Sequence, residues 1–467
     1  MIRSFRFECI QVLSCLAVLA ACSSAGEAQN ISAADTAITN VHVLDGTGAP
    51  ARRVGAVLIE DGLIAAILPQ GETDFEAAQT LDGGDGYLVP GFIDAHVHIL
   101  VPRCQSFASG EPVFDRQLSE KVASALLDFG ITTVRSPATP TVDGLALRDD
   151  LNAGVVRGPQ AKASAEFIND SRMSEAELRD YVRDAMAYKP DYFKVYARLS
   201  KQQVATVIDE AHRHGVPVIG HLGKTSWREG AELGIDFLTH AVDWSAKTLP
   251  PESREAYETA RRERGAIRAR LDWLELLDLK SEEVTSMIEA LVAHDIPVDP
   301  TLVAYDAKFS RPTYASYRQN PNAKVVPELF QDWSECSGLA DDWTEEDYAR
   351  WRGLFPKLQA LVKLMHERGV TLITGSDTPN EWVIPGEGLH QELELLVEAG
   401  LSPAEVLSMT GEKAARALGF EDRGVVAAGK RADLVLLSEN PMADIRNTRE
   451  ISWVMQTGDV IFPRQRE

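Results

Sequence analysis

Cysteine is scarce in this sequence, and three of its five cysteines lie within the first 22 residues. Only Cys104 and Cys336 remain in the body of the chain. A disulfide-dense scaffold and a four-cysteine zinc site are therefore excluded. The two cysteines are not spaced as a zinc clip, and whether they pair with each other stays open.

Positive charge is also in short supply. The chain has 47 Lys and Arg against 70 Asp and Glu, which gives a formal net charge of −23 over 467 residues. Nucleic acids and anionic membrane surfaces both require basic patches, so we expect neither as a partner. Hydrophobic residues make up 45% of the chain, which is ordinary for a globular protein with a sizeable core.

Long apolar runs are lacking too. The stretch Ile10–Ala21 is too short for a transmembrane helix, and the two arginines before it make it typical of an export signal. The run Leu19-Ala20-Ala21-Cys22-Ser23 resembles a bacterial lipoprotein box, which implies cleavage before Cys22 and lipidation of its thiol. The alternative is a plain secretory signal cut nearby. Ser23 suggests the outer membrane, so we expect an exported protein that faces the periplasm and touches the membrane only through its lipid.

Short strands with tight turns stand at both ends of the remaining chain. Residues 36–44, 56–60 and 63–67 read as strands, and Asp61-Gly62 predicts a hairpin turn. Residues 429–437 and 454–460 repeat the pattern, so we predict a small β-sandwich built from both termini. The predicted boundaries are a signal peptide at 1–21, a tether at 22–35, the two sandwich parts at 36–88 and 425–467, and a central domain at 89–424.

Strands and helices alternate through the central domain. Strands are expected at 132–135, 192–196, 216–221, 237–240, 296–301 and 370–377, with a weakly marked one within Val155–Phe167. The helices are expected at 119–129, 174–187, 201–213, 227–233, 282–293 and 351–368. These repeated units predict an α/β fold with a parallel sheet, and their number predicts a closed (β/α)8, TIM-like barrel. An aromatic-rich insertion, Tyr305–Tyr348, follows a strand end and is expected to cover the mouth of the barrel.

Side chains that can bind a metal ion stand at the ends of these strands. His96 and His98 close an apolar run, and residues two apart in a strand share one face, so both imidazoles can bind one cation. Imidazole nitrogen suits zinc and similar metals, although two histidines alone are as consistent with a surface pair. Further candidates at predicted strand ends are Lys194, His221, His240 and Asp377. The C-terminal rim of a barrel is where catalytic groups collect.

Three motifs resemble the amidohydrolase superfamily of metal-dependent hydrolases. They are Pro90-Gly91-Phe92-Ile93-Asp94-Ala95-His96-Val97-His98, Gly375-Ser376-Asp377-Thr378 and Gly429-Lys430-Arg431-Ala432-Asp433-Leu434-Val435. They match that family in order and span almost the whole mature chain. Within the superfamily the chain is most similar to the branch of imidazolonepropionase-like proteins and Xaa-Pro or Xaa-Arg dipeptidases.

The resemblance implies a role for each residue at a strand end. His96, His98 and Asp377 would hold one divalent metal ion, and His221 and His240 a second, with zinc as the expected metal. Lys194 would bridge the ions as an N6-carboxylated lysine, because an ammonium has no lone pair for a metal. The alternative is a snorkelling lysine on the barrel rim. A bridging hydroxide would attack an amide carbonyl, and catalytic Asp377 would carry the proton to the leaving nitrogen.

Three further residues are predicted to contact the substrate. Arg135 ends a strand and is expected to bind a substrate carboxylate, although a structural ion pair is equally consistent. Tyr196 shares a strand face with Lys194 and is expected to bond a tetrahedral oxyanion, with core packing as the alternative. His390 opens a helix, where substrate contact and helix capping both stay open.

The sequence therefore predicts a binuclear hydrolase of an amide bond in a dipeptide or an N-acyl amino acid. A second hypothesis keeps the fold but uses one metal for a cyclic amide or a deamination. A third is a lipid-anchored binding protein without catalysis. The expected partner is a small-molecule amide or dipeptide, and a homo-oligomer is compatible with the sequence.

Overall fold

The computed structural model describes residues 34–103, 113–310, 320–334, 340 and 342–461. The predicted signal peptide, the lipidation site at Cys22, and both Cys104 and Cys336 lie outside these residues. Among the helices described, none is long and apolar enough to cross a membrane. The predicted export, lipid anchor and domain boundaries stay predictions.

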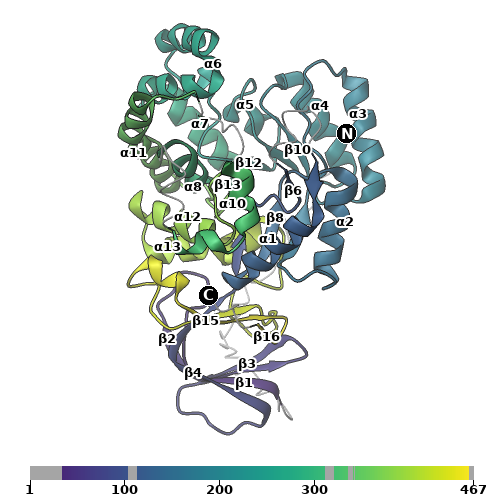
Figure 1. Ribbon diagram of the computed structural model, residues 1–467, viewed down its shortest axis with the longest axis vertical. Helices are drawn as coiled ribbons and strands as arrows, with labels where there is room; N and C mark the ends of the chain where they lie inside the picture. The colour runs from purple at the N-terminus through teal and green to yellow at the C-terminus, as the bar shows by residue number, and fades with distance from the viewer. Residues whose placement is uncertain (1–33, 104–112, 311–319, 335–339, 341, 462–467) are drawn as a thin grey trace, which may run out of the picture. The chain divides into compact units, whose positions relative to one another are not determined.

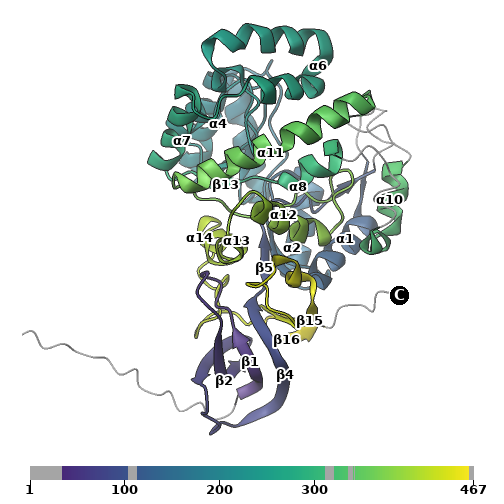
Figure 2. The same ribbon diagram turned by 90° about the vertical axis from the view of Figure 1, so that its left-hand side faces the viewer.

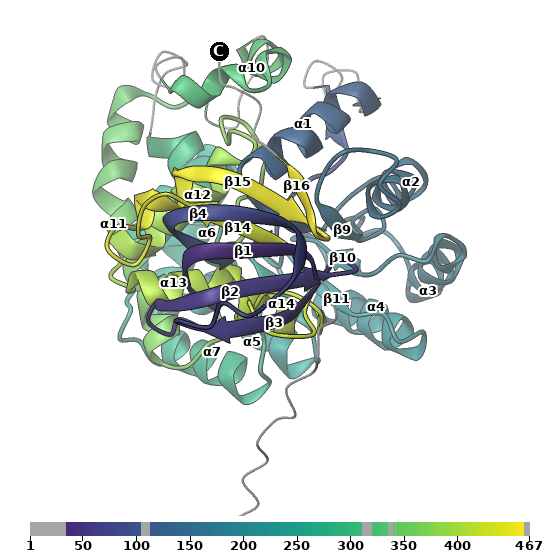
Figure 3. The same ribbon diagram turned by 90° about the horizontal axis from the view of Figure 1, so that it is seen from below.

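One seven-stranded sheet takes strands from both ends of the chain, in the order β16-β15-β14-β4-β1-β2-β3 (Figure 3). Its members are β1 (Ala34–Val43), β2 (Arg52–Glu60), β3 (Leu63–Pro69), β4 (Ala77–Pro90), β14 (Leu434–Leu437), β15 (Ile451–Gln456) and β16 (Asp459–Ile461). Asp61 and Gly62 both have positive φ between β2 and β3, as the predicted hairpin turn requires. Antiparallel pairing places Leu436 of β14 opposite Leu88 of β4. The pairings put both termini in one sheet, while a sandwich of two sheets stays a prediction.

Short parallel strands carry the candidate site. Two sheets contain them, in the orders β5-β8-β9 and β10-β11-β12-β13. The strands are β5 (Phe92–Asp94), β8 (Ile131–Ser136), β9 (Gln160–Ala163), β10 (Phe193–Val195), β11 (Val218–Gly220), β12 (Phe237–Thr239) and β13 (Val298–Asp299). A separate antiparallel pair is formed by β6 (Val101–Pro102) and β7 (Phe114–Asp115). Since parallel strands end on the same side, residues that follow them gather at one edge.

Helices connect these strands, as the repeated pattern predicts for a mixed α/β fold. The first group is α1 (Arg116–Asp128), α2 (Thr141–Asn152), α3 (Glu175–Ala185), α4 (Lys201–Arg213), α5 (Trp227–Glu232), α6 (Arg254–Leu276) and α7 (Glu282–Ala293). The second is α8 (Leu302–Tyr305), α10 (Pro327–Ser334), α11 (Glu345–Glu367), α12 (Glu387–Glu398), α13 (Pro403–Thr410) and α14 (Glu412–Ala417). In Figure 1, α2, α3 and α4 lie on one side of the parallel strands, and α6, α7 and α11 on the other.

Five of these helices begin with a capping box. In it, the side-chain oxygen of the N-cap residue accepts from the N–H of the third helical residue, whose side chain accepts in turn from the N–H of the N-cap residue. The pairs are Ser174 with Glu177, Ser200 with Gln203, Ser226 with Glu229, Thr344 with Asp347, and Ser402 with Glu405. Each box satisfies backbone N–H groups that the helix leaves unpaired. The boxes therefore fix where the helices start relative to the strands before them.

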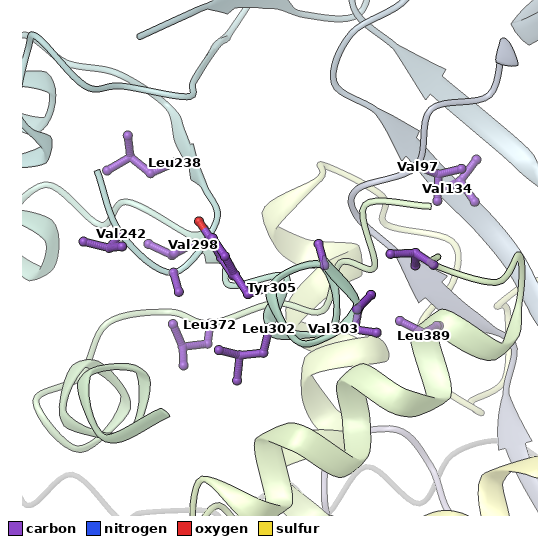
Figure 4. Close-up of a cluster of buried hydrophobic side chains, with 14 of the residues drawn as sticks. Val97, Val134, Leu238, Val242, Val298, Leu302, Val303, Tyr305, Leu372 and Leu389 are labelled. Carbon is purple, nitrogen blue, oxygen red and sulfur yellow. The ribbon is translucent and has the colours of Figure 1, made fainter. Parts of the chain in front are cut away.

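The core joins strand residues to the helices that cover them. Figure 4 shows Val97, Val134 and Leu372 among side chains of α8 and α12, such as Leu302 and Leu389. Val97 is completely buried in this cluster, while His96 and His98 on either side of it line a cavity. The chain alternates here as the strand pattern predicts, so hydrophobic burial of Val97 orients the two imidazoles.

Candidate metal and active site

The six predicted ligands line one cavity of about 400 Å³. We call them the ligand wall: His96, His98, Lys194, His221, His240 and Asp377. Lys194 lies in β10, His221 follows β11 and His240 follows β12, whereas His96 and His98 follow β5. Asp377 belongs to a segment with two isolated parallel bridges: its Leu372 pairs with Val298, and its Thr378 pairs with Val97. Residues from five places in the sequence therefore meet at one edge of the parallel strands.

Three of these residues form a compact group. The ligand atoms of His96, His98 and Asp377 all lie within 4.8 Å of one another. Asp377 Oδ1 is 3.3 Å from His96 Nε2 and 3.1 Å from His98 Nε2. One carboxylate oxygen facing two imidazole nitrogens is a donor set that suits zinc.

The other two histidines lie beside this group. The ring centre of His240 is 5.0 Å from that of His96 and 4.3 Å from that of His221. The buried nitrogens His96 Nε2 and His221 Nδ1 have no hydrogen-bond partner within the described residues. Because buried polar atoms are nearly always satisfied, these orphaned nitrogens fit a role as metal donors.

Neighbouring residues orient the histidines. Asp299 Oδ1 is 2.6 Å from His96 Nδ1, and Thr301 Oγ1 is 2.8 Å from His240 Nδ1. The carbonyl oxygen of Ala138 is 3.2 Å from His98 Nδ1. With Nδ1 engaged outside the cavity, each of these rings presents Nε2 toward it, as metal-binding histidines commonly do.

Three residues of the site have a strained backbone. His240, Thr301 and Asp377 all have positive φ, at 73°, 49° and 60°. Such conformations cost roughly 1–3 kcal/mol each and persist where the surroundings over-determine them. A Cβ added at Gly375 would lie 2.7 Å from the His96 Cβ, so only glycine fits there. The glycine of the Gly-Ser-Asp motif is therefore explained by its close packing against His96.

Charge states in the ligand wall follow from burial. Burial lowers the pKa values of His96, His221 and His240 well below the ordinary value, so these rings are neutral at pH 7. Burial alone would raise the pKa of Asp377, but the surrounding histidines lower it well below its ordinary value. Neutral imidazoles around an ionised carboxylate are the protonation states that a metal ion requires.

Lys194 is buried within this group. Burial lowers the pKa of its ammonium to about 8, although Asp377 and Asp299 oppose the change. Its Nζ lies 5.5 Å from the ring centre of Tyr196, which itself stacks on His221 at 4.0 Å. An exposed rim lysine that snorkels to solvent does not describe this side chain, because it is only 2% exposed.

Arg135 is not placed where it was predicted. It is completely buried and donates to Asp299 Oδ2 at 2.5 Å and to the Ala95 carbonyl at 2.7 Å. It does not line the cavity, so the predicted contact with a substrate carboxylate is corrected to the structural ion pair. Arg135 supports Asp299, which in turn orients His96.

His390 is also placed away from the cavity. Its ring is completely buried, with Nδ1 at 2.9 Å from Thr448 Oγ1 and Nε2 at 3.0 Å from the Phe129 carbonyl. It packs against Phe92 and Phe129. The predicted substrate contact is corrected to a packing role, because both ring nitrogens are engaged inside the core.

The wall facing the ligands was only partly foreseen. We define it as the outer wall: Arg270 of α6, Tyr305 of α8, and Lys308 and Phe309 of the following π-helix, Asp306–Ser310. These last three open the insertion predicted over the mouth, and they line the cavity as expected. Helix α6 was not expected, and Arg270 is one of six arginines in its charged sequence, which gave no reason to single it out. Asp299 was missed too, although its place at the end of β13 could have revealed it.

Apolar side chains complete the cavity. Leu100, Pro102, Phe114 and Phe167 line it together with Tyr196. Burial raises the pKa of Tyr196 to about 12, so its hydroxyl stays protonated at neutral pH. A largely apolar cavity with a few polar groups at one wall is typical of a small-molecule site.

Comparison with protein families gives a match over most of the chain. The model described as Amidohydrolase family matches residues 87–461. The imidazolonepropionase of Ectopseudomonas mendocina is 24% identical over 422 residues, which are 86% of this chain and 89% of that protein. The imidazolonepropionase of Chromobacterium violaceum is 29% identical over 232 residues, 39% of this chain. The chain matches only 55% of the length of this second relative.

Solved structures show the same fold at low identity. A Xaa-Pro dipeptidase with methionine bound in its active site aligns with a TM-score of 0.66 at 17% identity, over 91% of this chain and 99% of that one. Bottromycin amidohydrolase aligns with a TM-score of 0.66 at 21% identity, over 91% of this chain and 87% of that one. At these identities the likeness concerns the fold alone.

Proposed function

Since the chain belongs to the amidohydrolase family, we propose that it is a metal-dependent hydrolase that cleaves the amide bond of a dipeptide or an N-acyl amino acid. The observation that carries this proposal is the convergence of the six residues of the ligand wall on one cavity. A binding protein without catalysis would not need an ionised carboxylate beside four histidines and a buried lysine.

The ligand wall is suited to two divalent ions, and zinc is the metal we propose. His96, His98 and Asp377 would hold one, because their donor atoms already lie within 4.8 Å of one another. His221 and His240 would hold the other. When bound, such a metal pair polarises a carbonyl oxygen and lowers the pKa of water.

Lys194 is proposed to join the two metal positions as an N6-carboxylated lysine. Carboxylation requires an uncharged amine, and the pKa of about 8 leaves a larger neutral fraction than an ordinary lysine has. The product is an oxygen anion, which can contact metal where an ammonium cannot. In protein equilibrated with 13C-bicarbonate, we expect a carbamate carbon resonance that is absent in Lys194→Gln.

Asp377 and Tyr196 would move and donate protons. The carboxylate of Asp377 is ionised and can accept a proton from the attacking water, then deliver it to the leaving nitrogen. Tyr196 lines the same cavity and keeps its proton at neutral pH, so its hydroxyl can donate to the developing oxyanion. The apolar residues around them would exclude water from the reacting bond.

A closed (β/α)8 barrel is the architecture that we propose for the parallel strands. Isolated parallel bridges join Ser164 to Tyr192, Val298 to Leu372 and Val97 to Thr378. These link the sheet β5-β8-β9 with the sheet β10-β13 and bring the segment around Leu372 between β13 and the chain that follows β5. Such a circle of strands explains why all six ligands face one cavity.

A one-metal enzyme acting on a cyclic amide, or a deaminase, is the second candidate. The three-residue group of His96, His98 and Asp377 favours it, since this group alone gives three protein ligands. The imidazolonepropionases matched over 86% of the chain point the same way. Export as a lipoprotein anchored at Cys22 is proposed alongside either activity, with membrane fractionation of wild type and Cys22→Ala as its test.

Metal analysis and turnover decide between these functions. We expect two zinc equivalents per chain by elemental analysis, and hydrolysis of some members of a library of dipeptides and N-acyl amino acids supplied with zinc. One equivalent, with turnover of cyclic amides alone, would favour the second candidate. Full metal loading without hydrolysis of any amide would leave a binding protein as the better explanation.

A further inference from the structure

Two cations of the outer wall form no ion pair with any of the residues that the structure describes. Within the described residues, neither Arg270 nor Lys308 forms a hydrogen bond or an ion pair, yet both line the cavity. Arg268, two residues earlier on the same helix, instead donates to Asp347 at 2.8 Å. Both unpaired side chains are half-buried, so they are partly withdrawn from the water that would otherwise solvate their charges.

Aromatic rings hold Arg270 in place. Its guanidinium carbon lies 5.1 Å from the ring centre of Trp244 and 5.7 Å from that of Phe309. Trp244 is in turn fixed by its Nε1, which donates to the Tyr305 hydroxyl at 3.3 Å. Stacking on the faces of rings positions a guanidinium but leaves the N–H groups at its edge free to donate.

The two cations also act on each other and on the ligand wall. Burial lowers the pKa of Lys308, and Arg270 lowers it further, while Asp377 and Glu381 oppose this. Arg270 contributes to the lowered pKa of His221, and Lys308 to that of His240. Two like charges beside a partly dry cavity are costly unless an anion enters between them.

We propose that Arg270 and Lys308 bind the carboxylate of the substrate, so that the cavity selects amides that carry a free carboxylate next to the bond to be cleaved. This inference rests on the proposed hydrolase function and adds the two residues that determine its specificity. The fork of a guanidinium matches both carboxylate oxygens, and the ammonium adds a second charge-assisted bond. The apolar residues Leu100, Phe114 and Phe167 would then receive an apolar side chain.

The test compares paired substrates. Each N-acetyl amino acid is assayed beside its C-terminal carboxamide, which has the same amide bond but no negative charge. For wild type we expect kcat/KM to favour the acid by about 100-fold, as is typical when a charged hydrogen bond is lost. Arg270→Gln should reduce this preference to within about tenfold, mainly through KM, with Arg270→Lys intermediate. Lys308→Met should reduce it by a smaller factor.

The matched control is Arg262→Gln, which removes the same charge from an exposed position on α6 and should leave the preference unchanged. Equal use of acid and carboxamide by wild type would overturn the inference while leaving the hydrolase intact. An equal loss of both activities in Arg270→Gln, with Lys308→Met unaffected, would also overturn it.

A binding measurement separates this inference from the proposed reaction. N-alkyl amino acids, in which a methylene replaces the amide carbonyl, cannot be hydrolysed. By calorimetry on the metal-loaded protein, we expect them to bind more tightly than their carboxamides, and Arg270→Gln to reduce the difference in affinity to within about tenfold. If this difference appears without turnover of any amide, the proposed function fails and the carboxylate site stands. If turnover occurs but the difference is absent, only the carboxylate site fails.

Discussion

The two walls of the cavity are built in different ways. In the ligand wall each histidine with an engaged Nδ1 is fixed by a neighbouring strand or loop, and Arg135 supports Asp299 behind His96. In the outer wall the side chains are held by stacked rings, and its two cations have no partner among the described residues. The contrast teaches that the proposed chemistry and the proposed choice of substrate could vary separately, because hydrogen bonds orient three histidines of one wall while aromatic rings hold Arg270 of the other.

Among changes in the ligand wall, Asp377→Asn is expected to lower activity the most. It removes the only carboxylate of the three-residue group and the proposed proton carrier. We expect kcat to fall by about 1000-fold or more, since general acid–base catalysis and metal retention are lost together. Initial rates and elemental analysis check this. Asp143→Asn, an exposed change on α2, is the control, and an Asp377→Asn enzyme of normal rate would remove Asp377 from the mechanism.

Asp299→Asn tests the support behind the ligand wall. It leaves the Arg135 charge buried without its partner, so we expect unfolding free energy to drop by roughly 3–5 kcal/mol. Metal affinity should weaken about 10–100-fold, because His96 loses its orienting carboxylate. Denaturant titration and metal competition measure the two effects. The double variant with Arg135→Met should recover stability but not affinity; recovery of both would contradict an orienting role.

Tyr305→Phe tests how loosely the outer wall is held. It removes the hydroxyl that accepts from Trp244 but keeps the ring that faces His240. One neutral hydrogen bond contributes about 0.5–1.5 kcal/mol, so we expect KM to rise by no more than about tenfold. Steady-state kinetics at several substrate concentrations measure it, and an equally large fall in kcat would place Tyr305 in the chemistry instead.

A contact outside both walls gives the smallest effect on activity. Glu210 accepts from Arg183 at 2.7 Å and from Arg179 at 2.9 Å, and these arginines lower its pKa from 4.5 to about 2. Because the pKa is lower in the folded state, the ionised carboxylate stabilises the fold at pH values above the pKa of the unfolded state. This stabilisation is lost as the pH falls from about 4.5 toward 2. Glu210→Gln should therefore unfold more easily than wild type at pH 7 but equally at pH 2, with turnover unchanged. Denaturation curves at both pH values check this.

Much of the fold could be predicted, because its patterns are local. Helices at 201–213 and 282–293 lie where the periodicity put them, and Asp61-Gly62 forms its turn. The six strand-end ligands meet because parallel strands end together. Arg135 was misplaced for a different reason, since it too points inward from a strand. Whether such a residue reaches the cavity or lies beneath it depends on strand register, here Arg135 opposite Lys162.

Other features depend on contacts that no local pattern reports. The face that α12 turns toward the core decides that His390 packs against Phe129, and this rotation is set by tertiary packing. Asp299 became important only because β13 lies where its carboxylate meets both His96 and Arg135. Arg270 stands in a long charged helix whose sequence resembles a solvated surface, so only its position identifies it.

His98 and Asp377 touch across 279 residues of sequence. Strand β4 leads into β5 (Figure 2), after which the two histidines follow, and β4 is itself paired with β14 near the end of the chain. During biosynthesis, the histidines therefore leave the ribosome long before the carboxylate that must face them. A partial or proteolytically shortened chain has imidazoles but no binding centre. Loading of the proposed metal ions would thereby be restricted to the finished molecule, and a chain that ends before Asp377 should retain no zinc.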